Sequence, residues 1–177
     1  HQCGCKSAVA PPGTALTEAH ARLLSRYSDN VVLVYDGDAA GRRAAERGVG
    51  LFLAVDFDLR VGRLEGGEDP CDFFQRAKEE GAALLAKSTM DFFEFMLLEV
   101  SGRHDLDTTT GRVIAADELL ETAKGIVNPV KRGLIIERIA NHLRLDKADL
   151  QKRALSGAER RRKEPETQAS ARVDGPA

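Results

Sequence analysis

The sequence has little aromatic content, no long apolar run and almost no net charge, and these shortages limit what the chain can do. Aromatic residues make up 5% of the 177 residues, against 42% apolar and 31% charged residues. No apolar run approaches the roughly 18 residues that cross a bilayer, so we expect a cytoplasmic protein without membrane contact. The formal net charge is -2. Any contact with nucleic acid therefore has to come from local basic patches.

Cysteine and histidine are also scarce. Cys3, Cys5 and Cys71 are an odd number of cysteines, and the first two stand closer together than the cysteines of a zinc knuckle. We interpret them as reduced thiols. The four histidines have no ligand spacing, which argues against a metal site built on histidine. The chain begins with His1 and shows no signal peptide, and we expect it to be truncated at its N-terminus.

In the first half of the chain, strand, loop and helix follow one another three times. The patterns predict strands at Lys6–Ala10, Val31–Tyr35 and Leu59–Leu64. Helices are expected after them, at Glu18–Tyr27, Ala39–Val55 and Cys71–Glu80. This order is typical of an α/β fold with a parallel sheet flanked by helices. In such a sheet the loops that leave the carboxyl ends of the strands gather along one edge.

From Ser88 onward the apolar residues recur with a helical period. Helices are predicted at Met90–Val100, Thr108–Ile126, Pro129–Leu143 and Ala148–Leu155. The third of them carries an apolar packing stripe at Leu134, Ile135, Ile139 and Leu143. We therefore divide the chain into an α/β domain at 1–87, incomplete at its N-terminus, a small α-helical bundle at 88–155, and a disordered tail or linker at 156–177. The tail is polar and has almost no large apolar residue.

Two carboxylates flank a glycine at the point where the strand Val31–Tyr35 ends. Asp36 and Asp38 are two residues apart, so in extended backbone their side chains share a face, and Gly37 allows a sharp turn between them. Carboxylates held together repel each other unless a cation lies between them. Mg²⁺ (or Mn²⁺) suits such a pair, because it takes one or two carboxylates and fills its other positions with water and phosphate oxygens. The alternative is an ordinary surface turn, in which Asp and Gly are common.

A second acidic loop follows the next predicted strand. It contains Glu68, Asp69 and Asp72, and the parallel topology places it beside the first. We expect Asp69, together with Asp72 or Glu68, to serve a second metal ion.

Two arginines stand one turn into the helix that follows Asp38. Arg42 and Arg43 are placed to meet phosphate oxygens, and the helix N-terminus adds partial positive charge. The alternative is an exposed helix face on which Arg42 pairs with Glu46.

The residues from Val34 to Arg47 resemble the DxD segment of the Toprim fold in DnaG-type bacterial primases. The loop with Gly13 and Thr14 is similar to the glycine-threonine loop of that family, and Gly67–Pro70 is similar to its third acidic motif. Type IA topoisomerases share the fold, but they continue the DxD motif with Glu-Gly-Glu, where this chain has Ala39–Gly41. This difference favours a primase.

The resemblance implies a DNA primase, which synthesises short RNA primers on single-stranded DNA during bacterial replication by metal-dependent nucleotidyl transfer. It implies Asp36, Asp38 and Asp69 as catalytic carboxylates and metal ligands, with Gly13 and Thr14 approaching the nucleotide or the template. The implied partners are the single-stranded DNA template, the NTPs and the nascent RNA primer. A replicative helicase is expected to bind through a C-terminal domain outside this chain.

The chain departs from the family pattern in two places. The Toprim glutamate, the zinc ribbon and the basic half of the polymerase domain are not in this sequence, so zinc is expected only in a missing N-terminal part. The fragment alone is expected to be inactive or nearly so. Many relatives have an aspartate where this chain has Cys71. Either Asp72 replaces that carboxylate or one metal contact is lost.

Two other functions remain as alternatives. One is a non-catalytic Toprim-like module that binds nucleic acid or a partner protein, and the other is a Toprim nuclease. The gene sequence upstream of the codon for His1 distinguishes these two alternatives from a primase. A primase predicts a Glu-Gly motif there, preceded by a basic domain and a four-ligand zinc ribbon.

Overall fold

A small mixed sheet forms the centre of the first part of the chain. The computed structural model describes residues 5–11, 15–64 and 67–163, with side chains as far as residue 155. Its strands are β1 (Asn30–Val34), β2 (Asp58–Gly62) and β3 (Thr89–Asp91), in the order β1-β2-β3. β1 runs parallel to β2, with Asn30 opposite Asp58, and β3 runs antiparallel to β2. The parallel pair is as predicted, and β3 makes the sheet mixed.

One predicted strand is not formed, and one strand of the structure was not predicted. Residues 6–10 do not form a strand; the N–H of Ala8 donates to the carbonyl of Cys5 instead, at 3.4 Å, which closes a turn. Val9 is their only β-branched residue, and it is exposed. β3 was missed because its three residues are too few for an alternating pattern to be visible. It also runs directly into a helix.

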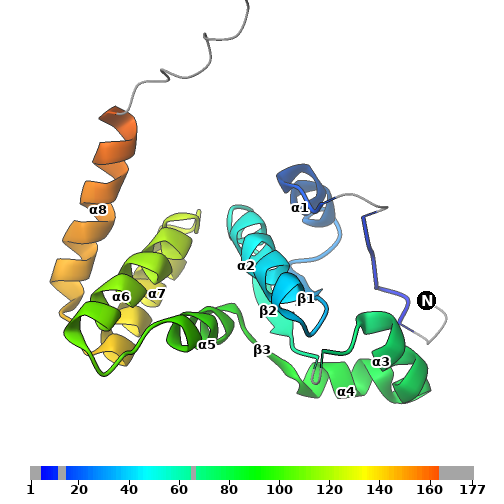
Figure 1. Ribbon diagram of the computed structural model, residues 1–177. Helices are drawn as coiled ribbons and strands as arrows, with labels where there is room; N and C mark the ends of the chain where they lie inside the picture. The colour runs from blue at the N-terminus through cyan, green and yellow to red at the C-terminus, as the bar shows by residue number, and fades with distance from the viewer. Residues whose placement is uncertain (1–4, 12–14, 65–66, 164–177) are drawn as a thin grey trace, which may run out of the picture.

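The helix α2 (Ala39–Leu53) covers the parallel pair of strands (Figure 1). Its buried residues Val49, Phe52 and Leu53 form part of the core with Leu33 and Leu59 of the strands. The shorter helix α1 (Glu18–Leu24) precedes β1, and Thr17 is its N-cap. The core therefore holds α2 against the sheet and fixes the direction in which the loop between β1 and α2 projects.

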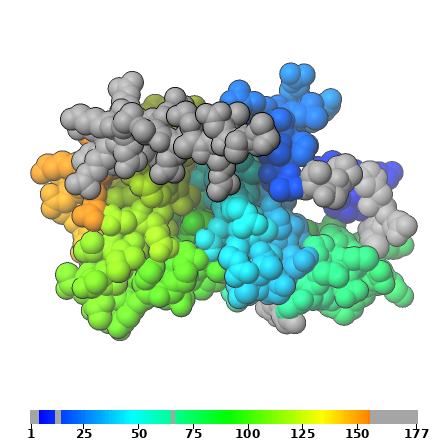
Figure 2. Space-filling model, turned by 45° about the horizontal axis from the view of Figure 1, so that its top comes forward, coloured from blue at the N-terminus to red at the C-terminus, as the bar shows by residue number. Residues whose placement is uncertain are grey.

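Between β2 and β3 the chain forms α3 (Pro70–Ala77), a 3₁₀ turn (Lys78–Glu80) and α4 (Gly81–Lys87). A single helix at Cys71–Glu80 was predicted here. The α-helix ends earlier, because Lys78 adopts a left-handed φ of 48°. α4 was not predicted. Figure 2 shows α2 in the middle of one face, between these helices and the second part of the chain.

The second part is helical, as predicted. It consists of α5 (Phe92–Arg103), α6 (Thr109–Lys124), α7 (Pro129–Leu143) and α8 (Lys147–Lys163). In the packing stripe of α7, Ile135, Ile139 and Leu143 are buried, whereas Leu134 is 59% exposed. One helical residue corresponds to about 100°, so Leu134 points away from the face on which Ile135 lies.

Several contacts join the second part to the first. The Nη1 of Arg138 on α7 donates to Oδ1 of Asp91 in β3 at 2.9 Å, and the Nδ2 of Asn128 donates to Oδ2 of Asp56 at 3.1 Å. Buried residues of the sheet and of α5 to α8 belong to one hydrophobic cluster. The domain boundary after residue 87 stays a prediction, and β3 connects residues 89–91 to the sheet.

The helix predicted at Ala148–Leu155 is longer in the structure, where α8 continues to Lys163. Ala, Glu, Arg and Lys in this stretch are strong helix formers. A disordered tail or linker at 156–177 stays a prediction. Residues 164–177 lie outside the described residues. None of the helices within the described ranges is long and apolar enough to span a membrane.

Candidate functional site

The loop after β1 carries Asp36 and Asp38, both of them exposed. Asp38 is the N-cap of α2, and its Oδ1 accepts a hydrogen bond from the N–H of Gly41 at 2.7 Å. This contact satisfies one of the free amides at the start of the helix. Asp38 therefore has a structural role of its own, and its second carboxylate oxygen takes no part in this contact.

Two glycines allow this loop to close. A Cβ on Gly41 would lie 2.1 Å from the carbonyl oxygen of Asp36, and a Cβ on Gly37 would lie 2.8 Å from the carbonyl oxygen of Leu64. Both distances are well below a van der Waals contact. The chain comes this close only because neither residue has a side chain.

The two acidic loops are neighbours, as predicted from the parallel topology. The N–H of Gly37 donates to the carbonyl of Glu68 at 3.0 Å. Asp69 is the N-cap of α3, and its Oδ1 accepts from the N–H of Asp72 at 2.8 Å. A backbone hydrogen bond thus joins the loops that contain Asp36, Asp38 and Asp69.

The other residues of the second acidic loop have partners of different kinds. Glu68 accepts two hydrogen bonds from Arg76, at 3.0 and 2.8 Å, and these hold the pKa of Glu68 below its usual value. Asp72 and Cys71 are exposed in the first turn of α3. Glu68 and Asp72 were the two residues expected to bind a second metal ion together with Asp69. Glu68 is bound by Arg76 instead. Gly13 and Thr14 lie outside the described residues.

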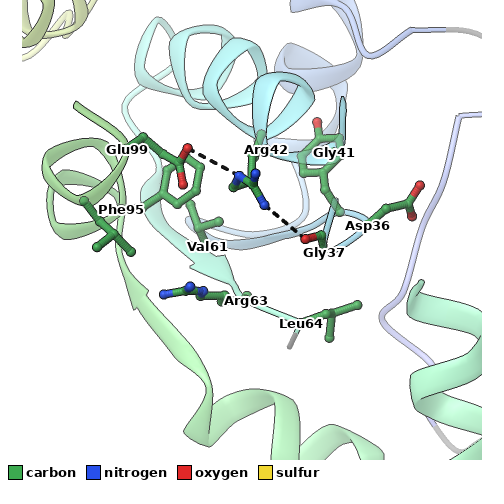
Figure 3. Close-up of a pocket in the computed structure, with 13 residues that line it drawn as sticks. Asp36, Gly37, Gly41, Arg42, Val61, Arg63, Leu64, Phe95 and Glu99 are labelled. Atoms are coloured by element: carbon green, nitrogen blue, oxygen red, sulfur yellow. Dashed lines mark hydrogen bonds and ion pairs between the residues drawn. The ribbon is translucent and has the colours of Figure 1, made fainter. Parts of the chain in front are cut away.

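Arg42 turns back toward the first acidic loop. Its Nη1 donates to the carbonyl of Gly37 at 3.2 Å, and its Nε lies 3.6 Å from Oε2 of Glu99 on α5 (Figure 3). Glu46, the alternative partner, pairs with Arg103 instead, at 2.7 Å. Arg43 is exposed. Contact of either arginine with phosphate stays a prediction.

A pocket of about 270 Å³ lies between the end of the sheet and α5. Figure 3 shows Arg42 and Glu99 on one side of it and Arg63 on another, while the carboxylate of Asp36 points away from them. Burial raises the pKa of Tyr35, which also lines the pocket, and the charge of Arg47 opposes this shift. Sequence reasoning missed Phe95 and Glu99, because only the packing of α5 brings them here.

The donor chemistry at this edge suits a hard cation. Asp36, Asp38 and Asp69 offer carboxylate oxygens, which Mg²⁺ and Mn²⁺ prefer, and their exposure leaves room for water and phosphate ligands. Within the described ranges, no group of three or more His, Cys, Asp or Glu residues is arranged to hold a metal ion.

Two family models match the chain. A model described as Toprim-like matches residues 1–74, and one described as the DnaB-helicase binding domain of primase matches residues 93–148. The DNA primase of Clostridium acetobutylicum is 29% identical over 144 residues, which are 80% of this chain and 24% of that protein. The DNA primase of Streptomyces coelicolor is 33% identical over 133 residues, which are 72% of this chain and 21% of that protein.

Two solved primase structures are also similar to this chain. The structure of the DnaG catalytic core has a TM-score of 0.73 and 29% identity, covering 84% of this chain and 49% of that one. The DnaG primase catalytic domain bound to single-stranded DNA has a TM-score of 0.74 and 29% identity, covering 82% of this chain and 47% of that one.

The fold and the matches first define a Toprim-like α/β unit with a helical part attached. More specifically, the chain belongs to the DnaG-type bacterial DNA primase family. It spans less than a quarter of the length of these two curated relatives and about half of these two solved structures. The match at 93–148 shows a similarity to a helicase-binding domain within this chain, whereas the sequence led us to expect such a domain outside it.

Proposed function

We propose that this chain supplies part of the catalytic core of a bacterial DNA primase, which builds short RNA primers from NTPs on a single-stranded DNA template. The observation that carries the proposal is the hydrogen bond from Gly37 to Glu68, because it joins two acidic loops at the carboxyl edge of parallel strands. In open α/β sheets this edge is where ligands bind. The similarity to a catalytic domain bound to single-stranded DNA supports the template as a partner.

In this proposal Asp36, Asp38 and Asp69 hold Mg²⁺ (or Mn²⁺), and Asp72 remains a further candidate. When bound, the metal lowers the pKa of the attacking 3′-hydroxyl and offsets charge that develops at phosphorus and on the pyrophosphate leaving group. The contribution of the protein is to keep the carboxylates in place. Asp38 does so through its cap contact with Gly41, and Asp69 through its cap contact with Asp72.

The proposal gives the remaining residues roles in binding. Gly13 and Thr14 would approach the nucleotide or template through their backbone. Arg43, exposed near the N-terminus of α2, would meet phosphate oxygens. The helical part, residues 93–148, would contact the replicative helicase, which the match to a helicase-binding family supports. The protein would act at the replication fork in the bacterial cytoplasm, with the structural zinc in a part outside this chain.

The metal site is tested by Mn²⁺ titration calorimetry of the chain and its Asp36→Asn/Asp38→Asn variant. Asparagine caps a helix about as well as aspartate, so this variant should fold normally and lose Mn²⁺ binding by at least about tenfold, since a carboxylate pair is replaced by neutral amides. Asp146→Asn is the matched control, because the Asp146 carboxylate also caps a helix, accepting from Ala148 and Asp149. Equal Mn²⁺ affinity in all three proteins would mean that Asp36 is only a turn residue and Asp38 only a helix cap, and that neither binds the metal.

Catalysis is tested in the full-length gene product, by incorporation of NTPs into primers on single-stranded DNA. The Asp36→Asn/Asp38→Asn variant should lose primer synthesis, and Asp146→Asn should retain it. Primer synthesis at the normal rate by the double variant would contradict the assignment of these carboxylates. Absence of primer synthesis in the unsubstituted protein, with cleavage of DNA instead, would favour the nuclease alternative.

A further inference from the structure

The peptide groups around Gly37 are held from two sides. The N–H of Gly37 donates to the carbonyl of Glu68 at 3.0 Å, and the carbonyl of Gly37 accepts from Nη1 of Arg42 at 3.2 Å. Asp36 and Asp38 are bonded covalently to these same peptide groups. A movement of Arg42 would therefore release the Gly37 carbonyl, which belongs to the backbone that joins Asp36 to Asp38.

Burial alone does not keep Arg42 in place. Its side chain is 46% exposed, and an exposed arginine loses considerable rotamer freedom when it is held in one orientation. The partner that restrains it is Glu99, whose side chain is only 16% exposed and whose Oε2 lies 3.6 Å from the Arg42 Nε. Figure 3 shows Arg42 lying between Glu99 and the Gly37 carbonyl.

Glu99 belongs to a different part of the molecule from the loop that it affects. It lies on α5, inside the segment 93–148 that matches the helicase-binding family model. A chain of contacts thus runs from the helical part through Glu99 and Arg42 to Gly37.

We propose that Glu99 is a positioning residue, which orients Arg42 and thereby keeps the loop of Asp36 and Asp38 in its metal-binding conformation. The proposal rests on the proposed function, because it concerns the same metal site. Glu99 touches no reacting atom in this scheme. Its effect passes through the guanidinium of Arg42 and the backbone of Gly37.

An electrostatic effect on the metal has to be separated from positioning. If only charge mattered, Glu99→Gln would weaken cation binding by removing a negative charge, and Arg42→Gln would strengthen it by removing a positive one. The double variant, with an unchanged net charge, would bind normally. Positioning predicts weaker binding in all three variants, because each of them releases the Gly37 carbonyl.

α2 provides a matched control. Glu46 lies one helical turn after Arg42 and pairs with Arg103 of α5 at 2.7 Å, so Glu46→Gln removes a comparable contact between the same two helices. Glu46 makes no contact with the acidic loop among its described interactions. Its loss should affect the packing of α2 on α5 without changing the restraint on Gly37.

The first readout is hydrogen exchange of the Gly37 amide, followed by NMR in the metal-free chain. Exchange should become at least about threefold faster in Arg42→Gln, Glu99→Gln and the double variant, because the loop opens more often, and should stay unchanged in Glu46→Gln. This measurement needs no bound metal. Unchanged exchange at Gly37 in Glu99→Gln would overturn the proposal whatever the metal site does.

The second readout is Mn²⁺ affinity by calorimetry. We expect a loss of about tenfold in Glu99→Gln, Arg42→Gln and the double variant, the size usual for groups that orient metal ligands. Tighter binding in Arg42→Gln, or normal binding in the double variant, would overturn the proposal in favour of plain electrostatics. If Gly37 exchange responds as expected but the unsubstituted chain binds no Mn²⁺, the contact chain stands and the metal site of the proposed function fails.

Discussion

The acidic edge of the sheet and the helical part are held together by different forces. At the acidic edge, Asp36, Asp38 and Asp69 are exposed, and caps, backbone hydrogen bonds and close approaches of glycine maintain the loops. In the helical part, stripes of fully buried aliphatic side chains pack α6 against α7. Buried contacts therefore stabilise the helical part, whereas the edge presents the exposed carboxylates of the proposed metal site.

The sizes of the two kinds of interaction agree with this difference between the helical part and the acidic edge. Burying one large aliphatic side chain contributes roughly 1.5 to 3 kcal/mol, whereas a helix cap contributes about 1 kcal/mol. Substitutions in the helical part should therefore change stability most, and substitutions at the edge should change ligand binding most.

The largest expected change in stability comes from Ile139→Ala on α7. Ile139 is fully buried, so the cavity and the lost burial should lower the free energy of unfolding by about 3 kcal/mol. Urea unfolding followed by circular dichroism measures this change. Leu134→Ala on the same helix is the control, because Leu134 is exposed, and it should change stability by less than about 0.5 kcal/mol. Equal losses in the two variants would mean that α7 does not pack as described.

Gly41→Ala should affect both properties. The new Cβ meets the carbonyl of Asp36, so the loop has to move, at a cost of about 1 to 3 kcal/mol, and Mn²⁺ affinity should fall with it. Gly50→Ala on the same helix is the control. Nothing lies within 4 Å of a Cβ there, so alanine should stabilise α2 by up to about 1 kcal/mol and leave Mn²⁺ affinity unchanged. Normal Mn²⁺ binding by Gly41→Ala would show that the metal site does not depend on the geometry of this loop.

Features that depend on local sequence could be predicted. The strand at Val31–Tyr35 is a continuous run of strand-forming residues, and the helix at Pro129–Leu143 has a strong helical period. The acidic loops were expected to be neighbours because the parallel arrangement of β1 and β2 follows from the order of the elements. Local propensity and simple topology were sufficient for these features.

Features that depend on contacts distant in sequence could not be predicted. β3 exists because β2 offers an edge to Thr89–Asp91, and three residues carry no readable pattern of their own. Glu99 approaches Arg42 only because α5 packs beside the sheet. The sequence offered Glu46 as the partner of Arg42, since it lies four residues away on the same helix. Tertiary packing provided Arg103 for Glu46 instead.

The smallest expected effect is on the pH dependence of stability. It can be compared between one carboxylate of the helical part, Glu118, and one of the acidic edge, Glu68. Burial alone would raise the pKa of Glu118 on α6, but hydrogen bonds from His104 and Arg103 hold this pKa below the usual value of 4.5. Glu68 at the acidic edge has a lowered pKa through Arg76, which is itself 63% exposed. Two partners act on Glu118 and one on Glu68. We therefore expect Glu118 to contribute more to the pH dependence of stability.

A carboxyl group with a lowered pKa in the folded state stabilises the fold above its unfolded pKa, and this stabilisation is lost as the pH falls through the folded pKa. Glu118→Gln should therefore lower the free energy of unfolding near pH 6, by less than about 1 kcal/mol because the pair is partly exposed to solvent. The difference from the unsubstituted chain should shrink as the pH falls below 4.5, the usual value for Glu118. Urea unfolding at a series of pH values measures both effects. A larger pH-dependent difference in Glu68→Gln than in Glu118→Gln would reverse the comparison and make ion pairing more important at the acidic edge than among the helices.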